Sequence, residues 1–426
     1  MAKTTDSDVI YDWNTIESRG PITTKPIVFF DETLRDGIQS PSAIDPAIED
    51  KVELVHLMEA LGIQYVDIGL PGAGKRQYDD VFRLATEVRD HKLKIKLACA
   101  CRTVVKDIEP VVDIVAKTGV PIEVMAFIGS SPIRQFAEEW TLDFILQQSA
   151  AAIDFAVKNG LTCTYVTEDT TRSRPDALDK LFRMAIDHGV AGLCLCDTVG
   201  HATPDGIRNL VKWTKNLIEG AGAKERVRVD WHGHNDRGMA VANALWAIEA
   251  GVDRVHGTAL GIGERVGNCS MDQLLVNLKL LGLLPNQDLS KMLLYCQLAG
   301  RACGYEIPIN YPVVGKDAFR TATGVHAAAI LKALRKGDAW LADRIYSGVP
   351  ATEFGKEQEI EIGFMSGQAN VSFWLEKRHI PASPGLVTTI VERAKRSSRI
   401  LTEAEVLDTV KTWNATPREA TAVAKS

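Results

Sequence analysis

The stretch IVFFDETLRDG, residues 27–37, places a short apolar run directly before a cluster of acidic and basic side chains. Similar apolar or β-branched runs recur along the chain at intervals of 27 to 40 residues. They begin at Tyr65, Lys94, Pro121, Leu161, Gly192, Val227 and Arg254. We interpret each run as a strand, because short apolar segments bounded by turn residues are typical of buried strands.

The segments between these runs have the periodicity of helices. In residues 45–62, for example, apolar side chains fall on one face, Asp45 is placed to cap the helix and Gly62 to end it. Eight continuously apolar strands that alternate with helices predict a (β/α)8 TIM barrel over residues 27–284. A doubly wound open sheet is the alternative, because periodicity does not show whether a sheet closes.

The alternation of strand-like runs and helical segments ends at Leu284-Pro285. We expect the rest of the chain to be a mainly helical C-terminal appendage. We predict a helical subdomain over residues 285–348, which carries His326, and a second mainly helical subdomain with a tail over residues 349–426. A short strand fits only at Glu359–Ile362. Residues 1–26 form an N-terminal extension before the barrel.

The composition excludes several classes of protein. Of 426 residues 46% are apolar and 24% charged, which is typical of a globular chain of two or three domains. The net charge of −6 argues against a nucleic-acid partner, and no apolar run reaches the roughly 20 residues of a membrane span. We expect a cytoplasmic protein without a membrane partner. Its eight cysteines are too sparse for a disulfide framework, so we expect reduced core cysteines.

Polar residues gather where the predicted strands end, which is where TIM barrels carry their reactive groups. His232 and His234 are two residues apart on a strand, so both imidazoles point to the same side. Asp36 and Asn268, at the ends of the first and last strands, are the nearest oxygen donors that complete a metal site. Such a set suits Mn²⁺, Mg²⁺, Zn²⁺ or Co²⁺, and the alternative is that the histidines are structural polar groups.

Three further strand-end residues have a chemical and a structural interpretation. Arg35 is placed to stabilise charge on a carbonyl oxygen polarised by the metal, or it forms an ion pair in the barrel mouth. Glu168 follows apolar residues that favour a general base, or it is a structural hydrogen-bonding group. Thr198 can donate to a substrate carboxylate or cap the next helix.

Several motifs together resemble the metal-dependent Claisen-condensing acyltransferases of the 2-isopropylmalate, homocitrate and citramalate synthase family. They are DETLRDGIQSPSA (31–43), FIGSSPIR (127–134), TEDTTR (167–172), DTVGHATP (197–204), HGHNDRGMAVANALWAIEAG (232–251) and GTALGIGERVGNCSMDQL (257–274). The resemblance continues beyond the barrel in IPINYPVVGKDAF (307–319), TGVH (323–326) and MSGQAN (365–370).

The resemblance implies that acetyl-CoA condenses with a 2-oxo acid and that water then cleaves the thioester. It implies Asp36, His232, His234 and Asn268 as metal ligands, Arg35 as the carbonyl-polarising group and Thr198 as the site of the substrate carboxylate. Glu168 and His326 are the candidates for removing the acetyl proton. The appendage of a partner subunit in a homodimer is expected to deliver His326, and Gln39, Gly261 and Gly263 to line the CoA side.

The chain departs from the family at positions that bear on the substrate. Ile38 stands where isopropylmalate-type members usually have Glu, so a charge beside the metal is missing. Thr321-Ala322 stands where they have His-Glu, which weakens any Glu-assisted activation of His326. Met125, Val166 and Cys194 are expected to make one pocket wall apolar, which favours an alkyl 2-oxo acid. Our first choice is 2-oxoisovalerate, giving 2-isopropylmalate in leucine biosynthesis. Another alkylmalate, homocitrate or citramalate synthase, an HMG-CoA-lyase-like or aldolase-type lyase, and a catalytically silent paralogue are the alternatives.

Overall fold

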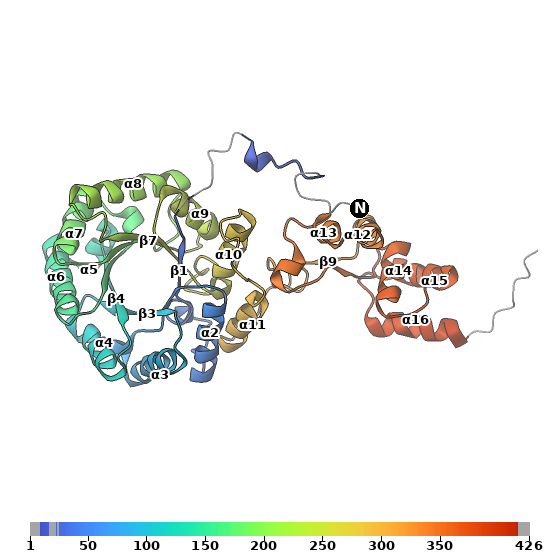
Figure 1. Ribbon diagram of the computed structural model, residues 1–426, viewed down its shortest axis with the longest axis horizontal. Helices are drawn as coiled ribbons and strands as arrows, with labels where there is room; N and C mark the ends of the chain where they lie inside the picture. The colour runs from blue at the N-terminus through green and yellow to red at the C-terminus, as the bar shows by residue number, and fades with distance from the viewer. Residues whose placement is uncertain (1–8, 17–22, 24, 416–426) are drawn as a thin grey trace, which may run out of the picture. The chain divides into compact units, whose positions relative to one another are not determined.

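Eight parallel strands close into a barrel in the computed structural model, which describes residues 9–16, 23 and 25–415 (Figure 1). The strands are β1 (Val28–Asp31), β2 (Tyr65–Asp67), β3 (Lys96–Arg102), β4 (Ile122–Gly129), β5 (Cys163–Glu168), β6 (Gly192–Asp197), β7 (Arg228–Gly233) and β8 (Arg254–Gly257). The first strand pairs with both β2 and β8, with Phe30 opposite Tyr65 on one side and His256 on the other. This closure confirms the predicted TIM barrel and excludes the open sheet.

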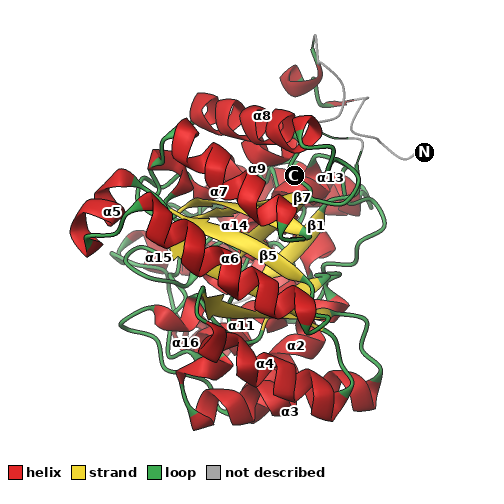
Figure 2. Ribbon diagram, turned by 90° about the vertical axis from the view of Figure 1, so that its left-hand side faces the viewer, coloured by secondary structure: helices red, strands yellow, loops and turns green. Residues whose placement is uncertain are grey.

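Helices surround the strands, as Figures 1 and 2 show. They are α2 (Ile48–Ala60), α3 (Lys75–His91), α4 (Val105–Thr118), α5 (Pro132–Glu138), α6 (Leu142–Lys158), α7 (Pro175–Asp187), α8 (Pro204–Gly220), α9 (Ala240–Ala250), α10 (Met271–Leu280) and α11 (Met292–Ala302). None of the helices in the described part of the chain has the length and apolar character needed to cross a membrane.

The predicted cap of the first of these helices is wrong. Helix α2 begins after Ala47, whose backbone is extended, and no side chain caps it. The carboxylate of Asp45 instead lies 2.6 Å from Lys51 Nζ and 2.8 Å from Arg76 Nη2. Lys51 and Arg76 therefore pair with the Asp45 carboxylate, which we expected to accept hydrogen bonds from the backbone N–H groups of the first turn of α2.

A layer of ion pairs fills the barrel interior near the amino ends of the strands. The Arg254 side chain, 1% exposed, donates to Glu123 Oε2 at 2.9 Å and to Asp230 Oδ2 at 2.5 Å. Its guanidinium carbon lies 4.4 Å from the centre of the Phe30 ring and 4.6 Å from that of Tyr65. Because a buried charge is costly unless it is paired, these contacts make Arg254 a structural element of the barrel.

All eight cysteines are buried and free, as predicted. Burial raises the pKa of the Cys163 thiol to about 12, so this side chain stays protonated at neutral pH. The thiols therefore behave mainly as small apolar groups in the barrel core.

The chain divides into two compact units, Glu17–Ile307 and a second that combines Met1–Ile16 with Pro308–Ser426. The second unit contains β9 (Arg320–Thr321) paired with β10 (Glu359–Ile360). Strand β10 lies within the predicted range, whereas β9 lies in a segment that we expected to be helical. Its helices are α12 (Gly324–Arg335), α13 (Ala339–Arg344), α14 (Gln368–Lys377), α15 (Pro384–Lys395) and α16 (Glu403–Ala415). The mainly helical character of the appendage is thereby confirmed, while the subdomain boundary at residues 348–349 stays a prediction.

Two of the sequence motifs meet in this second unit. The Gly324 N–H of the TGVH motif donates to the Met365 carbonyl of the MSGQAN motif at 3.1 Å. A Cβ on Gly324 would lie 3.1 Å from the backbone nitrogen of Gly367. Glycine at position 324 therefore allows the first turn of α12 to approach the loop before α14.

Candidate active site at the barrel mouth

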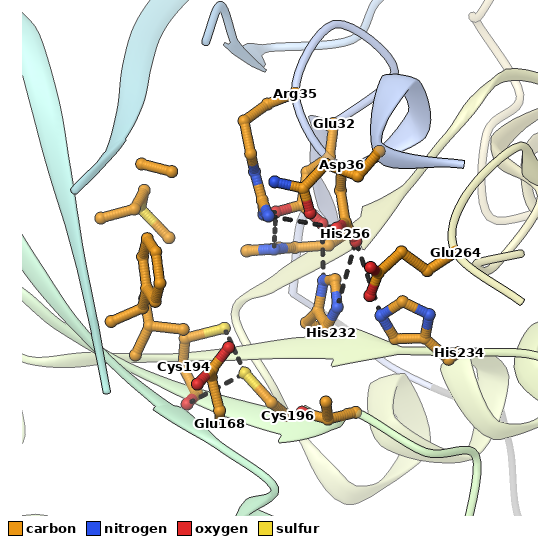
Figure 3. Close-up of a pocket in the computed structure, with 16 residues that line it drawn as sticks. Glu32, Arg35, Asp36, Glu168, Cys194, Cys196, His232, His234, His256 and Glu264 are labelled. Atoms are coloured by element: carbon orange, nitrogen blue, oxygen red, sulfur yellow. Dashed lines mark hydrogen bonds and ion pairs between the residues drawn. The ribbon is translucent and has the colours of Figure 1, made fainter. Parts of the chain in front are cut away.

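One cavity lies at the carboxyl ends of the strands and collects most of the predicted site residues (Figure 3). Its lining residues are Glu32, Arg35, Asp36, Gln39, Ala100, Met125, Phe127, Val166, Glu168, Cys194, Cys196, Thr198, His232, His234, His256 and Glu264. The cavity thus brings together the predicted metal ligands Asp36, His232 and His234, the predicted substrate wall, and the predicted catalytic residues Arg35 and Glu168.

Asp36, His232 and His234 bring their ligand atoms together on one side of the cavity. The Nε2 atoms of His232 and His234 each lie 3.5 Å from Asp36 Oδ2. One oxygen and two imidazole nitrogens, all within 4.8 Å of one another, form a group that could hold a metal ion. All three residues are buried, which is the environment of a preformed centre.

Asn268 stands beside this group without lining the cavity. Its amide nitrogen donates to Asp36 Oδ2 at 2.5 Å, and its buried Oδ1 has no hydrogen-bond partner in the described structure. A Cβ on Gly263 would collide with that Oδ1, so only glycine fits there. Gly261 has a φ of +66°, and a Cβ there would lie 2.5 Å from Ser270 Oγ and 3.0 Å from the Asn268 carbonyl oxygen. The two glycines make room for Asn268, and their contact with CoA stays a prediction.

Glu32 has a position that we did not predict from the sequence. Its Oε2 accepts from His232 Nδ1 at 2.6 Å and its Oε1 from Arg35 Nη2 at 2.6 Å. Burial would raise the pKa of Glu32, but the charges of His232 and Arg35 lower it well below its ordinary value. Against the effect of burial, Glu32 raises the pKa of His232 to about 10. The available signal was a second acidic residue at the end of the first strand, three positions before Arg35.

We expect Glu32→Gln to weaken metal binding by about 10- to 100-fold, because carboxylates behind a ligating imidazole fix its tautomer and orientation. Titration of the purified variant with Mn²⁺ or Zn²⁺, read by calorimetry, measures this change. Glu249→Gln, at a glutamate outside the cavity that pairs with Arg208 at 3.2 Å, is the control. Equal affinities for Glu32→Gln and the control would contradict this role.

Three carboxylates fix the guanidinium of Arg35. It donates through Nε to Asp67 at 3.2 Å, through Nη1 to Asp36 at 3.1 Å and through Nη2 to Glu32 at 2.6 Å. Burial raises the pKa of Asp67 to about 7 against the opposing effect of Arg35. Since a guanidinium has five N–H groups, two remain for a ligand in the cavity.

Glu168 ends β5, and Thr198 directly follows the neighbouring strand β6. The Asp169 N–H donates to Thr198 Oγ1 at 2.8 Å, which leaves the hydroxyl hydrogen of Thr198 free to donate. Asp169 adopts a left-handed φ of 60°, and Arg172 holds its carboxylate at 2.7 to 3.0 Å. Burial raises the pKa of Glu168, and Arg134 at 3.9 Å opposes that rise.

One wall of the cavity is apolar. Met125, Val166 and Cys194 line it together with Ala100 and Phe127. Below it, Met125 packs with Phe30 and Ala98 in a small buried cluster. Ile38, by contrast, does not line the cavity.

His326 belongs to the C-terminal unit, in the first turn of α12. Its ring stacks on Tyr346, with the ring centres 4.0 Å apart and the planes at 28°. Thr321 ends β9, and the Ala322 carbonyl accepts from Ser366 Oγ at 2.7 Å. The delivery of His326 to a barrel mouth stays a prediction.

His256 is a second lining residue that we did not predict. It lies on β8 two residues after Arg254, so both point into the barrel. Its Nδ1 is 3.4 Å from Glu32 Oε1 and its Nε2 is 3.6 Å from Asp230 Oδ2. The available signal was a pair of polar residues at alternate positions in a strand that is otherwise apolar.

The family model described as HMGL-like matches residues 26–298, which span the barrel and its metal-ligand group. The chain belongs to the HMGL-like family. Homocitrate synthase from Pyrococcus abyssi is 30% identical over 378 residues, covering 89% of this chain and 97% of the relative. Probable 2-isopropylmalate synthase from Methanopyrus kandleri is 30% identical over 368 residues, covering 86% and 68%. The family resemblance predicted from the motifs is therefore confirmed.

A solved structure of HMG-CoA lyase from Pseudomonas aeruginosa has a TM-score of 0.56, covers 66% of this chain and 94% of the lyase, and is 19% identical. At that identity the likeness establishes the fold alone. The curated relatives of this HMGL-like protein are synthases, so it is an enzyme of the alkylmalate and homocitrate synthase type.

Proposed function

We propose that the enzyme condenses acetyl-CoA with an apolar 2-oxo acid, and that the acid is 2-oxoisovalerate, giving 2-isopropylmalate for leucine biosynthesis. The observation that carries the choice of substrate is the apolar wall of Met125, Val166 and Cys194, which faces the same cavity as Arg35 and Asp36. An aliphatic side arm buries against such a wall, whereas a second carboxylate there would lose its hydration without a partner.

A divalent metal fits the donor set of Asp36, His232 and His234, with Asn268 Oδ1 as a buried oxygen that has no partner among the described residues. When bound, a divalent cation such as Mn²⁺, Mg²⁺, Zn²⁺ or Co²⁺ supplies Lewis-acid polarisation of the keto oxygen. Glu32 would keep the His232 ring oriented through its Nδ1 contact of 2.6 Å.

The chain's own side chains then orient the keto acid. Arg35, held by Glu32, Asp36 and Asp67, presents its remaining N–H groups to the oxygen on which negative charge develops. Thr198 donates its free hydroxyl hydrogen to the substrate carboxylate. Both groups are fixed before substrate binds, so little reorganisation is needed in the transition state.

Glu168 is the base that we favour for the acetyl methyl group, because burial raises its pKa toward neutrality. It takes one methyl proton, the resulting carbanion bonds to the keto carbon as the C=O π bond breaks, and the oxyanion takes up a proton from Glu168 or water to become a hydroxyl. Water then cleaves the thioester, which yields a second carboxylate and the free thiol of CoA. His326 is the second candidate for the proton transfer.

A thiol-release assay with a panel of 2-oxo acids tests this function. We expect free CoA thiol with acetyl-CoA, a divalent metal and 2-oxoisovalerate, and a specificity for 2-oxoglutarate lower by about 100-fold or more, because one unpaired buried carboxylate costs a few kcal/mol. Relative to 2-oxoisovalerate, 2-oxobutyrate lacks one methylene and pyruvate lacks two. The specificity should fall in that order, since each methylene is worth about 1–3 kcal/mol. Thiol release with none of the acids would contradict the proposal, and metal-dependent cleavage of 2-hydroxyacyl compounds would favour the lyase alternative.

We propose in addition a homodimer in which the partner subunit's His326 completes each barrel mouth. His326→Ala and Asp36→Asn should each be inactive, while their mixture after subunit exchange should regain about a quarter of the wild-type rate. Half of the dimers are then mixed, and each has one intact site. A mixture that remains inactive, although native mass spectrometry confirms mixed dimers, would place His326 in its own subunit's site, and an active His326→Ala would place it outside the reaction.

A further inference from the structure

Two neighbouring outer helices of the barrel, α2 and α3, carry a cluster of metal-ligand side chains away from the cavity. His56 Nε2 lies 2.9 Å and His91 Nδ1 lies 2.8 Å from the same oxygen, Glu87 Oε1. None of these three residues lines the barrel mouth. The cluster therefore serves something other than the proposed condensation.

The carboxylate at the centre of the cluster is held in place. Glu87 is 5% exposed, and its other oxygen, Oε2, accepts from Arg83 Nη1 at 2.6 Å. Arg83, Glu87 and His91 follow one another at intervals of four residues, so they lie on one face of α3. Arg83 thus fixes the Glu87 carboxylate through Oε2, and Oε1 contacts the two imidazoles.

The two imidazoles are arranged to share a ligand. Their ring centres are 5.5 Å apart with the planes at 81°, and the three ligand atoms lie within 4.8 Å of one another. The His56 and His91 side chains are 39% and 57% exposed, so an ion and a water molecule can reach them. Two nitrogens and one carboxylate oxygen with an open position make a ligand set typical of Zn²⁺.

We propose that His56, Glu87 and His91 bind Zn²⁺, with water as the fourth ligand, and that the ion links α2 to α3 on the outside of the barrel. Imidazole ligands disfavour the hard cations Mg²⁺ and Ca²⁺, which take oxygen donors. When the ion binds, the proton on the ring nitrogen that faces Glu87 is released from an imidazolium or moves to the other nitrogen of a neutral ring, so each ring binds in its neutral form. It crosslinks elements that come from residues 48–60 and 75–91.

Equilibrium dialysis of the full chain against Zn²⁺ tests the site. The double variant His56→Gln plus His91→Gln should bind one Zn²⁺ fewer per chain than the wild type, whatever the stoichiometry at the barrel mouth. The matched control is His188→Gln, which removes an imidazole paired with a carboxylate, Asp154, at 2.6 Å. It should retain the wild-type stoichiometry, because a single histidine and carboxylate do not make a site.

Two further measurements separate zinc binding from folding and from catalysis. Zn²⁺ should raise the Tm of a His234→Ala protein, and the same addition should not raise it when His56→Gln and His91→Gln are also present. Thiol release in the otherwise wild-type double variant should match that of the wild type. Equal zinc stoichiometry in the folded double variant and the wild type would overturn the proposal. Failure of the thiol-release assay alone would contradict only the proposed condensation.

Discussion

Asp36→Asn is expected to reduce the rate of thiol release by about a thousandfold or more. The Oδ2 atom of Asp36 is the oxygen that both His232 Nε2 and His234 Nε2 approach at 3.5 Å. Replacing the carboxylate with an amide removes the negative charge and one of two acceptor oxygens, of which Oδ1 accepts from Arg35 Nη1 and Oδ2 from Asn268 Nδ2. Loss of Lewis-acid stabilisation is worth several kcal/mol, and each 1.36 kcal/mol is a factor of ten in rate.

Two readouts distinguish this effect from general damage. The variant should keep the far-ultraviolet circular dichroism of the wild type while losing metal affinity in a calorimetric titration. Asp79→Asn, at an exposed aspartate paired with Lys75 at 2.7 Å, is the control and should leave the rate within twofold. A variant of Asp36 with wild-type turnover would remove this residue from the proposed mechanism.

Arg254→Met should lower the free energy of unfolding by about 3–5 kcal/mol, the usual cost of removing one partner from a buried ion pair. Arg254 is 1% exposed and donates to Glu123 and Asp230, both of which would stay buried. Denaturant titration of the unfolding of the barrel measures this change in free energy. The slope m of the variant should equal that of the wild type, which shows that only the stability has changed. The control is Arg183→Met, which breaks an exposed ion pair with Asp179. It should change the free energy of unfolding by less than about 1 kcal/mol.

The loss in Arg254→Met should also depend on pH. Burial would raise the pKa values of Glu123 and Asp230, but Arg254 and Arg228 lower both. A lowered pKa in the folded state stabilises the protein above the unfolded pKa, and that stabilisation is lost as the pH falls. The difference between wild type and Arg254→Met should therefore be larger at pH 7 than at pH 4. A difference that grows as the pH falls would contradict the assignment.

Local patterns were sufficient to predict the barrel and much of the candidate site. Alternating apolar runs and helical segments predicted the TIM fold, because each element must bury an apolar face against the next. The spacing of His232 and His234 predicted two rings on one side of a strand, and the ends of parallel strands meet at one face. Asp36, Arg35 and Glu168 could be placed at the cavity for the same reason.

Contacts between distant strands could not be predicted in this way. Glu32 lies on the first strand's end and reaches His232, 200 residues further along the chain. His256 and Arg254 meet Glu32, Asp230 and Glu123 only because β1, β4, β7 and β8 turn their inner faces to the same axis. A single sequence does not specify which inward polar side chain pairs with which, because the pairing depends on register and on rotamers in the packed interior.

The same division holds on the outside of the barrel. The four-residue spacing of Glu87 and His91 is visible in the sequence, but His56 joins them from another helix. The sequence by itself determined the order of strands and helices, the polar strand ends and the family, since these depend on periodicity and on local motifs. Only the tertiary structure decided which charges neutralise one another, because desolvation makes each buried charge depend on neighbours that the fold brings from elsewhere in the chain.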